Sequence, residues 1–229
     1  SYDPKIEEEQ IHTLVSRGAD GLLLIGHDRR PEIIDYLEEK NIPALVAWAH
    51  DPKARLPSVG FDNFAAMSEL ARHVIELGHR RIGMISAWTK VNDRARSRLK
   101  ALRSVMIKSD LDPTKLILIE TDYGIETGAS AFSQIMKQSH APTVIICSND
   151  VLAAGALKKA KSLGISIPRD VSVTGFDDIE LAEAVTPELT TIHVPHRNMG
   201  KEAAKSLVNM VNGITFQKNI ELDVHLKLR

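Results

Sequence analysis

Apolar residues along the chain occur in two arrangements, short continuous runs and longer stretches in which they recur at helical spacing. Runs such as Thr143–Cys147 and Val171–Gly175 are rich in β-branched residues and predict strands buried on both faces. Glycines such as Gly78 and Gly164 follow the helical stretches, because glycine readily adopts the left-handed conformation that closes a helix. The predicted strands lie near residues 21–25, 44–48, 81–86, 116–120, 143–147, 171–175, 190–194 and 220–226. The predicted helices lie near residues 5–17, 31–40, 64–77, 94–109, 126–138, 151–163 and 197–212.

Strands and helices alternate through almost the whole sequence. This order predicts right-handed β-α-β units and mostly parallel sheets with helices on both faces. The fold class is therefore α/β. The 229 residues, 43% of them hydrophobic, suffice for one large domain or two lobes. No Gly/Ser-rich linker stands out, so any second domain is joined by short crossings.

The amino-acid composition limits the kinds of partner that this chain can bind. Lys and Arg number 29 against 30 Asp and Glu, a net charge of -1, so the chain has no general attraction for nucleic acid. If DNA is a partner, another segment must contact it. The single cysteine, Cys147, lies in an apolar run and is expected to be a buried residue rather than a reactive thiol. No apolar span reaches membrane length, and the first residues do not form a signal peptide.

Polar and aromatic side chains follow several of the predicted strands, among them Trp48, Tyr123, Asn149 and Asp177. The carboxyl ends of parallel strands meet at one edge of a sheet, where ligands bind. Rings beside amides and carboxylates suit a small polar molecule such as a polyol or nucleoside. A structural role is open for each residue. Asn149 is also a good helix N-cap, Asp177 a turn former, and the two rings packing residues.

Three arginines stand at every second position after Asp93. Arg94 and Arg98, four residues apart, share one face of the predicted helix. This face is either solvated or turned towards the ligand crevice. In the crevice, a guanidinium donates to two ligand oxygens and pairs with Asp177 when the site is empty.

Catalytic signatures are absent. The sequence has no nucleophile elbow, glycine-rich phosphate loop, zinc-binding H-E-x-x-H helix or C-x-x-C pair. The histidines lack metal-ligand spacing, and the closest pair, His193 and His196, is separated by a segment that contains Pro195. We therefore expect binding without catalysis, metal or cofactor.

Several motifs occur in an order and spacing that resemble the effector-binding domain of the lactose-repressor (LacI/GalR) family of bacterial regulators. They are Ser148–Leu157, Leu163–Asp178, Pro187–Ile192 and Met199–Ala204, with Gly18–Leu24, Gly60–Asn63 and Leu77–Ile82 upstream. The likeness runs through essentially the whole chain. It departs from the family pattern at Ala101-Leu102, where Gly-Phe is common, at Val194, and at Trp48.

The resemblance implies two Rossmann-like lobes of the type I periplasmic-binding-protein kind, with an effector held between them. The expected amino-terminal lobe is 1–61 plus 194–218, and the expected carboxyl-terminal lobe is 62–193 plus 219–229. The family's helix-turn-helix head and first β-α-β do not precede Ser1, so the amino-terminal lobe is expected to be incomplete with an exposed sheet edge.

The resemblance also implies site residues. Asn149 and Asp177 would bind effector hydroxyls, Arg98 would be the main guanidinium donor with Arg94 beside it, and Tyr123 would be an aromatic platform. Trp48 stands where the family often has an acidic residue, which points to an effector larger or less hydroxylated than a simple hexose.

The implied function is that of a cytoplasmic, homodimeric repressor, which binds a sugar, sugar derivative, nucleoside or purine. It would control operator DNA through the head outside this sequence, with no membrane partner. The alternative is a periplasmic sugar-binding protein of a transporter, which would carry a signal peptide instead of a helix-turn-helix.

Overall fold

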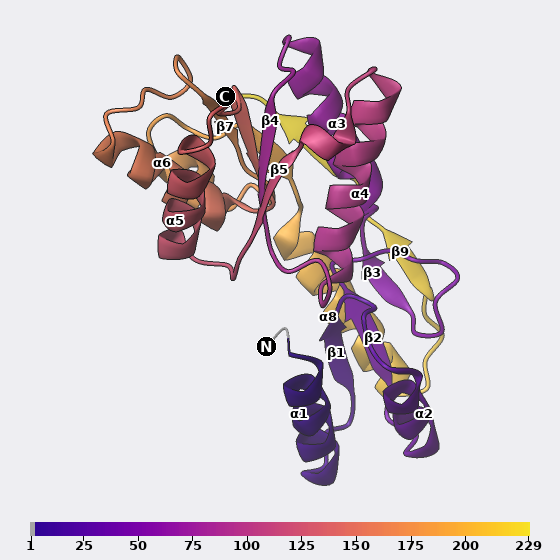
Figure 1. The fold of residues 1–229 in the computed structure, drawn as a ribbon. Helices are drawn as coiled ribbons and strands as arrows, with labels where there is room; N and C mark the ends of the chain where they lie inside the picture. The colour runs from indigo at the N-terminus through magenta and orange to yellow at the C-terminus, as the bar shows by residue number, and fades with distance from the viewer. Residues whose placement is uncertain (1–2) are drawn as a thin grey trace. The chain divides into compact units, whose positions relative to one another are not determined.

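The computed structural model describes residues 3–229, and the chain divides into two compact units. The first unit runs up to Asn63 and adds Lys90–Arg94 and Pro195–Asp223. The second unit is formed by Phe64–Thr89, Ala95–Val194 and Val224–Arg229. Each unit is an α/β layer structure with its own parallel sheet (Figure 1).

The first unit has a four-stranded parallel sheet in the order β1-β2-β3-β9. Its strands are β1 (Leu22–Ile25), β2 (Ala44–Ala47), β3 (Ser58–Gly60) and β9 (Asn219–Glu221). Its helices are α1 (Pro4–Ser16), α2 (Pro31–Glu39) and α8 (His196–Val211). A proline in the first turn of both α1 and α2 fixes the helical φ where no amide hydrogen bond is lost. Ile11, Leu37 and Val46 form part of the core between helices and sheet.

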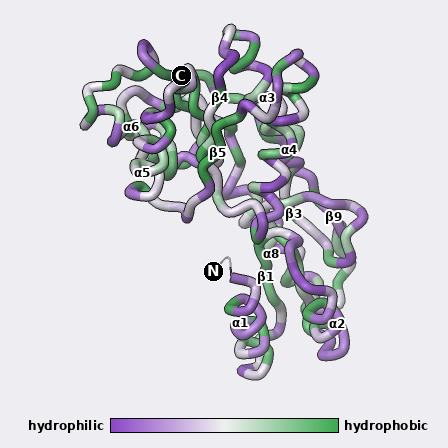
Figure 2. Tube along the Cα trace, in the orientation of Figure 1, coloured by the Kyte–Doolittle hydropathy of each residue, from purple (hydrophilic) through white to green (hydrophobic). Residues whose placement is uncertain are grey.

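Strand β1 lies at the open edge of this sheet. Leu22 and Leu24 are buried, whereas Leu23 and Ile25 on the opposite face are each 45% exposed. The apolar character of the whole strand is visible in Figure 2. Within the described residues, β1 therefore has a strand partner on one side only.

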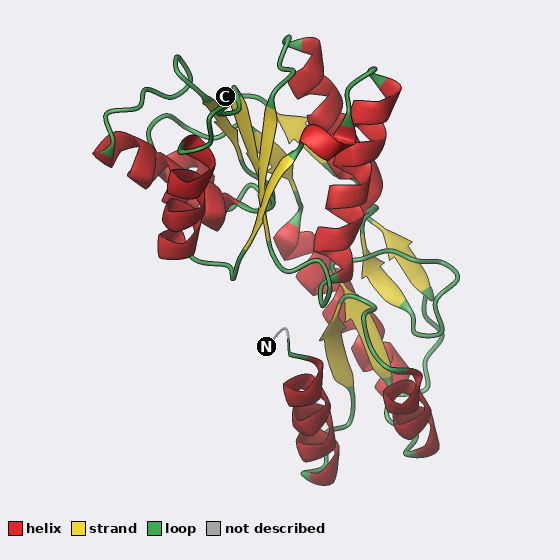
Figure 3. Cartoon of the chain, viewed as in Figure 1, coloured by secondary structure: helices red, strands yellow, loops and turns green. Residues whose placement is uncertain are grey.

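The second unit has a four-stranded parallel sheet in the order β5-β4-β6-β7 and a two-stranded antiparallel sheet (Figure 3). The strands are β4 (Ile82–Ser86), β5 (Ile117–Glu120), β6 (Val144–Cys147) and β7 (Ser172–Thr174), with β8 (Thr191–His193) paired to β10 (His225–Lys227). The helices are α3 (Asn63–Glu76), α4 (Asp93–Lys108), α5 (Ile125–Met136), α6 (Asp150–Ser162) and α7 (Leu181–Ala184), with a 3-10 turn at Pro113–Lys115.

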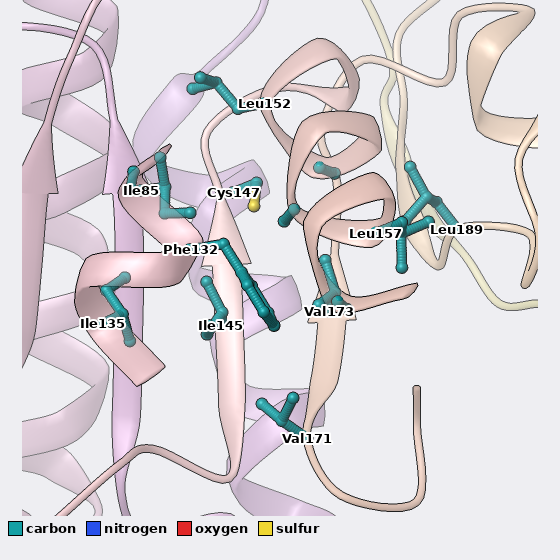
Figure 4. Packing of buried hydrophobic residues seen from close by; sticks show 14 of the residues in the cluster. Ile85, Phe132, Ile135, Ile145, Cys147, Leu152, Leu157, Val171, Val173 and Leu189 are labelled. Atoms are coloured by element: carbon teal, nitrogen blue, oxygen red, sulfur yellow. The ribbon is translucent and has the colours of Figure 1, made fainter. Parts of the chain in front are cut away.

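A dense apolar core joins α5, α6 and the sheet of the second unit. Phe132 and Ile135 of α5 pack with Ile145 of β6, and Leu157 of α6 lies beside Leu189 (Figure 4). The two helices touch backbone to backbone. A Cβ added at Gly155 would lie 2.1 Å from the carbonyl oxygen of Ile125. Glycine is therefore required at this crossing.

Two features of the predicted fold were wrong in detail. The single strand expected at 220–226 is two strands, because β9 pairs in parallel with β3 whereas β10 pairs antiparallel with β8. Residues 219–223 consequently belong to the first unit and not, as expected, to the carboxyl-terminal lobe. The short elements β3 and α7 were not predicted. Their three or four residues carry too little periodicity, so pairing with distant strands decides them.

Across residues 3–229, no helix is both long and apolar enough to cross a membrane.

Candidate ligand-binding site

Arg98 connects the carboxyl ends of two strands in the second unit. It projects from α4 and is 4% exposed. Its Nη1 donates to the carbonyl oxygen of Ser148, after β6, at 2.5 Å. The guanidinium carbon lies 3.6 Å from the ring centroid of Phe176, after β7, a cation–π contact. Its Nη2 lies 3.6 Å from Oδ1 of Asp177, which is the ion pair expected under one of the two alternatives that the sequence left open for this helical face.

The turn after β7 has an unusual backbone. Asp177 has φ 107° and Asp178 has φ 58°, both in the region that non-glycine residues seldom adopt. The amide of Asp177 donates to the carbonyl of Ile192 at 3.0 Å, and Val194 donates back to the carbonyl of Asp177 at 3.2 Å. This pairing with the β8 segment presents the carboxylate of Asp177 to Arg98. Such strained residues gather at ligand sites.

Asp178 points to a different group of side chains. Its Oδ2 lies 2.6 Å from Nδ1 of His193, and its Oδ1 accepts from Nη2 of Arg229 at 2.7 Å. Burial works to raise the pKa of Asp178, but these hydrogen bonds and the Arg229 and Lys227 charges hold it below its usual value. The carboxylate of Asp178 therefore forms structural ion pairs. Of the two neighbouring aspartates, Asp177 is the one that faces Arg98.

Asn149 acts as a helix cap. Its Oδ1 accepts a hydrogen bond from the amide of Leu152 at 2.9 Å, at the start of α6. Of the two roles open from the sequence, capping is thus confirmed. A ligand contact remains a prediction, carried by the amide NH₂ group, which can donate two hydrogen bonds.

The loops after β4 and β5 contribute two aromatic side chains. Tyr123 is half-buried and packs against the core of the second unit, so its packing role is seen and its stacking role stays a prediction. Trp88 is 47% exposed, and its Nε1 donates to Oδ1 of Asp122 at 2.9 Å. Trp88 also stands at a strand end but is not among the site residues expected from the sequence.

Trp48 and Arg94 belong to the first unit. Trp48 follows β2 with φ 70°, and its ring lies 5.0 Å from that of His196. Nη1 of Arg94 lies 2.7 Å from Oδ1 of Asp93, beside Gly26, where a Cβ would come within 1.6 Å of that nitrogen. The helical face shared by Arg94 and Arg98 is thus divided between two compact units, and their ligand contacts remain predictions.

Two residues at the site were not among the site residues expected from the sequence. Phe176 is fully buried below the guanidinium of Arg98, and Asp150, the first residue of α6, is also fully buried. The sequence could have indicated them only by their position, since Phe176 directly precedes Asp177 and Asp150 directly follows Asn149. Burial raises the pKa of Asp150 to about 6, opposed by hydrogen bonds from Thr191 and Ile179 and assisted by the charge of Asp177.

The raised pKa of Asp150 predicts a pH-dependent stability. An acid whose folded pKa is about 6, against an ordinary value of 3.8, binds its proton more tightly in the folded state. Its contribution to the free energy of unfolding is full below the unfolded value and is lost as pH rises through the folded one. Between about pH 5 and about pH 7.5, the loss is about 1 kcal/mol.

We expect Asp150→Asn to remove this component. Urea unfolding at several pH values checks it, with the difference between wild type and variant as the readout, since all other titrating groups cancel. A difference that stays constant over this range would contradict the ionisation of Asp150 near neutral pH.

No group of three or more His, Cys, Asp or Glu residues within residues 3–229 is arranged to hold a metal ion. Cys147 is fully buried in β6, and burial raises the pKa of its thiol, which disfavours the reactive thiolate. What the site offers is a guanidinium, a carboxylate, an amide and aromatic rings, which together can bind a polar molecule.

Comparisons with known proteins agree with this assignment. The periplasmic binding protein-like domain family matches residues 71–229. The transcriptional repressor CytR of Escherichia coli strain K12 is 34% identical over 211 residues, covering 90% of this chain and 60% of CytR. The repressor PurR of Salmonella paratyphi B is 34% identical over 218 residues, covering 94% of this chain and 63% of PurR. A solved LacI family regulator from Silicibacter pomeroyi has a TM-score of 0.86 at 26% identity, with 100% of this chain and 83% of that chain covered.

The chain spans about 60% of the length of these curated relatives. The family match covers well over half of the chain, and the parallel sheets follow the expected α/β fold. The chain therefore belongs to the periplasmic-binding-protein-like family, and within it to the effector-binding domains of LacI-family regulators.

Proposed function

We propose that this chain is the effector-sensing part of a transcriptional repressor and has no enzymatic activity. The observation that carries the proposal is the ion pair between the buried Arg98 and the half-buried Asp177, at the carboxyl ends of adjacent strands and next to Asn149 in the sequence. Ligands bind at this end of parallel sheets. The repressor names of the curated relatives support a regulator over a transporter's solute-binding protein.

The side chains favour a ligand that both donates and accepts hydrogen bonds. Asp177 accepts from a hydroxyl or ring N–H, while Arg98 and Asn149 donate to oxygens or ring nitrogens. Tyr123 offers an aromatic face to a sugar or base. This set suits a sugar, a sugar derivative, a nucleoside or a purine. For Trp48 and Arg94, an effector contact remains a prediction from the sequence.

The proposed regulation follows from differential binding. An effector that prefers one arrangement of the protein by about 1–3 kcal/mol changes operator affinity by several-fold to about 100-fold. We propose that operator DNA is bound by a helix-turn-helix head outside this sequence, in a cytoplasmic homodimer on a two-fold symmetric site.

A ligand screen tests the proposal. We expect ribose, cellobiose, adenosine or hypoxanthine to raise the midpoint of thermal unfolding, since a ligand that binds only the folded state stabilises it. Asp177→Ala should lower the affinity of the active compound by about 100-fold, because a charge-assisted hydrogen bond contributes about 1.5–3 kcal/mol. Isothermal titration calorimetry measures this change.

Asp170→Ala is the matched control. Asp170 also accepts from a backbone amide in the second unit, that of Ser166 at 2.7 Å, but it is exposed and precedes β7, whereas Asp177 follows that strand. The control should bind like wild type. Undiminished affinity in Asp177→Ala would show that the site is wrongly placed, and catalytic turnover of a tested compound would show that the class is wrong.

A further inference from the structure

Asp150 makes three hydrogen bonds to segments on both sides of the turn that carries Asp177. Its amide donates to the carbonyl of Phe176 at 2.9 Å. Its Oδ2 accepts from the amide of Ile179 at 2.9 Å, and its Oδ1 accepts from Oγ1 of Thr191 at 2.8 Å. One buried residue at the start of α6 thus connects to the turn before and after Asp177 and to β8.

The turn also packs closely against this carboxylate. A Cβ added at Gly175 would lie 2.0 Å from Oδ1 of Asp150. Gly175 has an ordinary φ, so glycine is needed here for space and not for backbone freedom. The backbone after β7 is therefore built directly against the Asp150 side chain.

The turn at Gly175–Ile179 has to be held in place because its backbone conformation is unfavourable. Asp177 and Asp178 both have positive φ, which the surrounding structure must maintain. A carboxylate suits the task because it accepts only, and each of its two oxygens receives a donor from a different segment.

Asp150 is also linked to both groups that contact Arg98, the carbonyl of Ser148 and the ring of Phe176. Arg98 donates to the carbonyl of Ser148, two residues before Asp150, and stacks on Phe176, whose carbonyl accepts from the Asp150 amide. Moving the turn relative to α6 would move Phe176 and Asp177 together, away from the guanidinium.

We propose that Asp150 is the positioning residue of the effector site: its buried carboxylate fixes the Gly175–Ile179 turn so that Asp177 and Phe176 face Arg98. The expected effect on effector affinity rests on the proposed function. The positioning of the turn by Asp150 does not, and it can be tested without a ligand. Asp150 is fully buried, so it would act through Asp177 and Phe176 and not by its own contact with the effector.

Hydrogen exchange tests the structural part. In Asp150→Ala, the amides of residues 176–179 should exchange about 10-fold faster or more, while the core strands β4 and β6 keep their protection. Asp150→Asn should restore slow exchange, because its carbonyl still accepts from Ile179 and its amide can donate to Thr191 instead. Asp170→Ala serves as the control for losing a carboxylate elsewhere in the second unit.

If Asp150→Ala does not fold, Thr191→Val provides the alternative test. It removes one donor to Asp150 and should give a smaller acceleration confined to the same residues. Exchange at 176–179 that is unchanged in the folded variants would overturn the proposal. So would acceleration spread evenly over the second unit, because that result describes general destabilisation and not positioning.

Titration with ribose, adenosine and hypoxanthine tests the consequence. We expect Asp150→Ala to bind about 10-fold or more weakly, Asp150→Asn to recover most of that loss, and the double variant with Asp177→Ala to bind no more weakly than Asp177→Ala alone. Additive losses would overturn a role through Asp177. If Asp177→Ala binds normally, the proposed function fails, while the exchange result still decides whether Asp150 holds the turn.

Discussion

Replacing Arg98 by alanine is expected to lower effector affinity by at least about 100-fold and to cost about 2–3 kcal/mol of unfolding free energy. Both losses have one origin. The variant leaves the carbonyl of Ser148 without its buried donor and removes the cation that faces Asp177. It also leaves Phe176 with an unfilled space above its ring.

Arg98→Lys separates charge from shape. Lysine keeps the positive charge but loses the planar fork, so it cannot reach Ser148, Phe176 and Asp177 together. We expect it to recover much of the stability and little of the affinity. Calorimetry with the compound found active in the screen measures the affinity, and urea unfolding measures the stability.

Arg103→Ala is the matched control, because Arg103 lies on the same helix but is exposed. It should leave both quantities near wild type. If Arg98→Lys binds as tightly as wild type, the guanidinium fork plays no part in effector binding and Arg98 is a structural cation only.

The α/β fold was predictable because its signals are local. Buried strands such as β4 and β6 are continuous apolar runs, and glycines with positive φ, such as Gly78 and Gly164, end the helices as expected. Strands β9 and β10 were not separable in the sequence, since only their partners, β3 and β8, assign them to different units.

The part of the site that lies at strand ends was predictable from the sequence. A pair between Arg98 and Asp177 was one of two alternatives left open by helical spacing and strand-end position, and the structure brings the two side chains together. Asp150 was not found, because a buried acid beside an N-cap has no signature of its own. Its role depends on Thr191 and Ile179, which are 41 and 29 residues away in sequence.

The contact between α5 and α6 gives the second large prediction. Gly155→Ala would place a methyl group 2.1 Å from the carbonyl oxygen of Ile125 and 2.9 Å from the amide nitrogen of Ala129. These are backbone atoms, which cannot rotate aside as a side chain can. The helices must therefore separate, and the packing of Phe132 and Leu157 between them and the sheet is lost in part.

We expect Gly155→Ala to lower the unfolding free energy by about 2–3 kcal/mol, even though alanine favours a helix over glycine by about 1 kcal/mol. Urea unfolding followed by circular dichroism measures the change. Gly200→Ala, in α8 with open space around the added methyl, isolates the propensity term and should stabilise the first unit slightly. Stabilisation of both variants would mean that α5 and α6 are less closely packed than the backbone distances require, because only a yielding interface could accept the methyl group at Gly155 without loss.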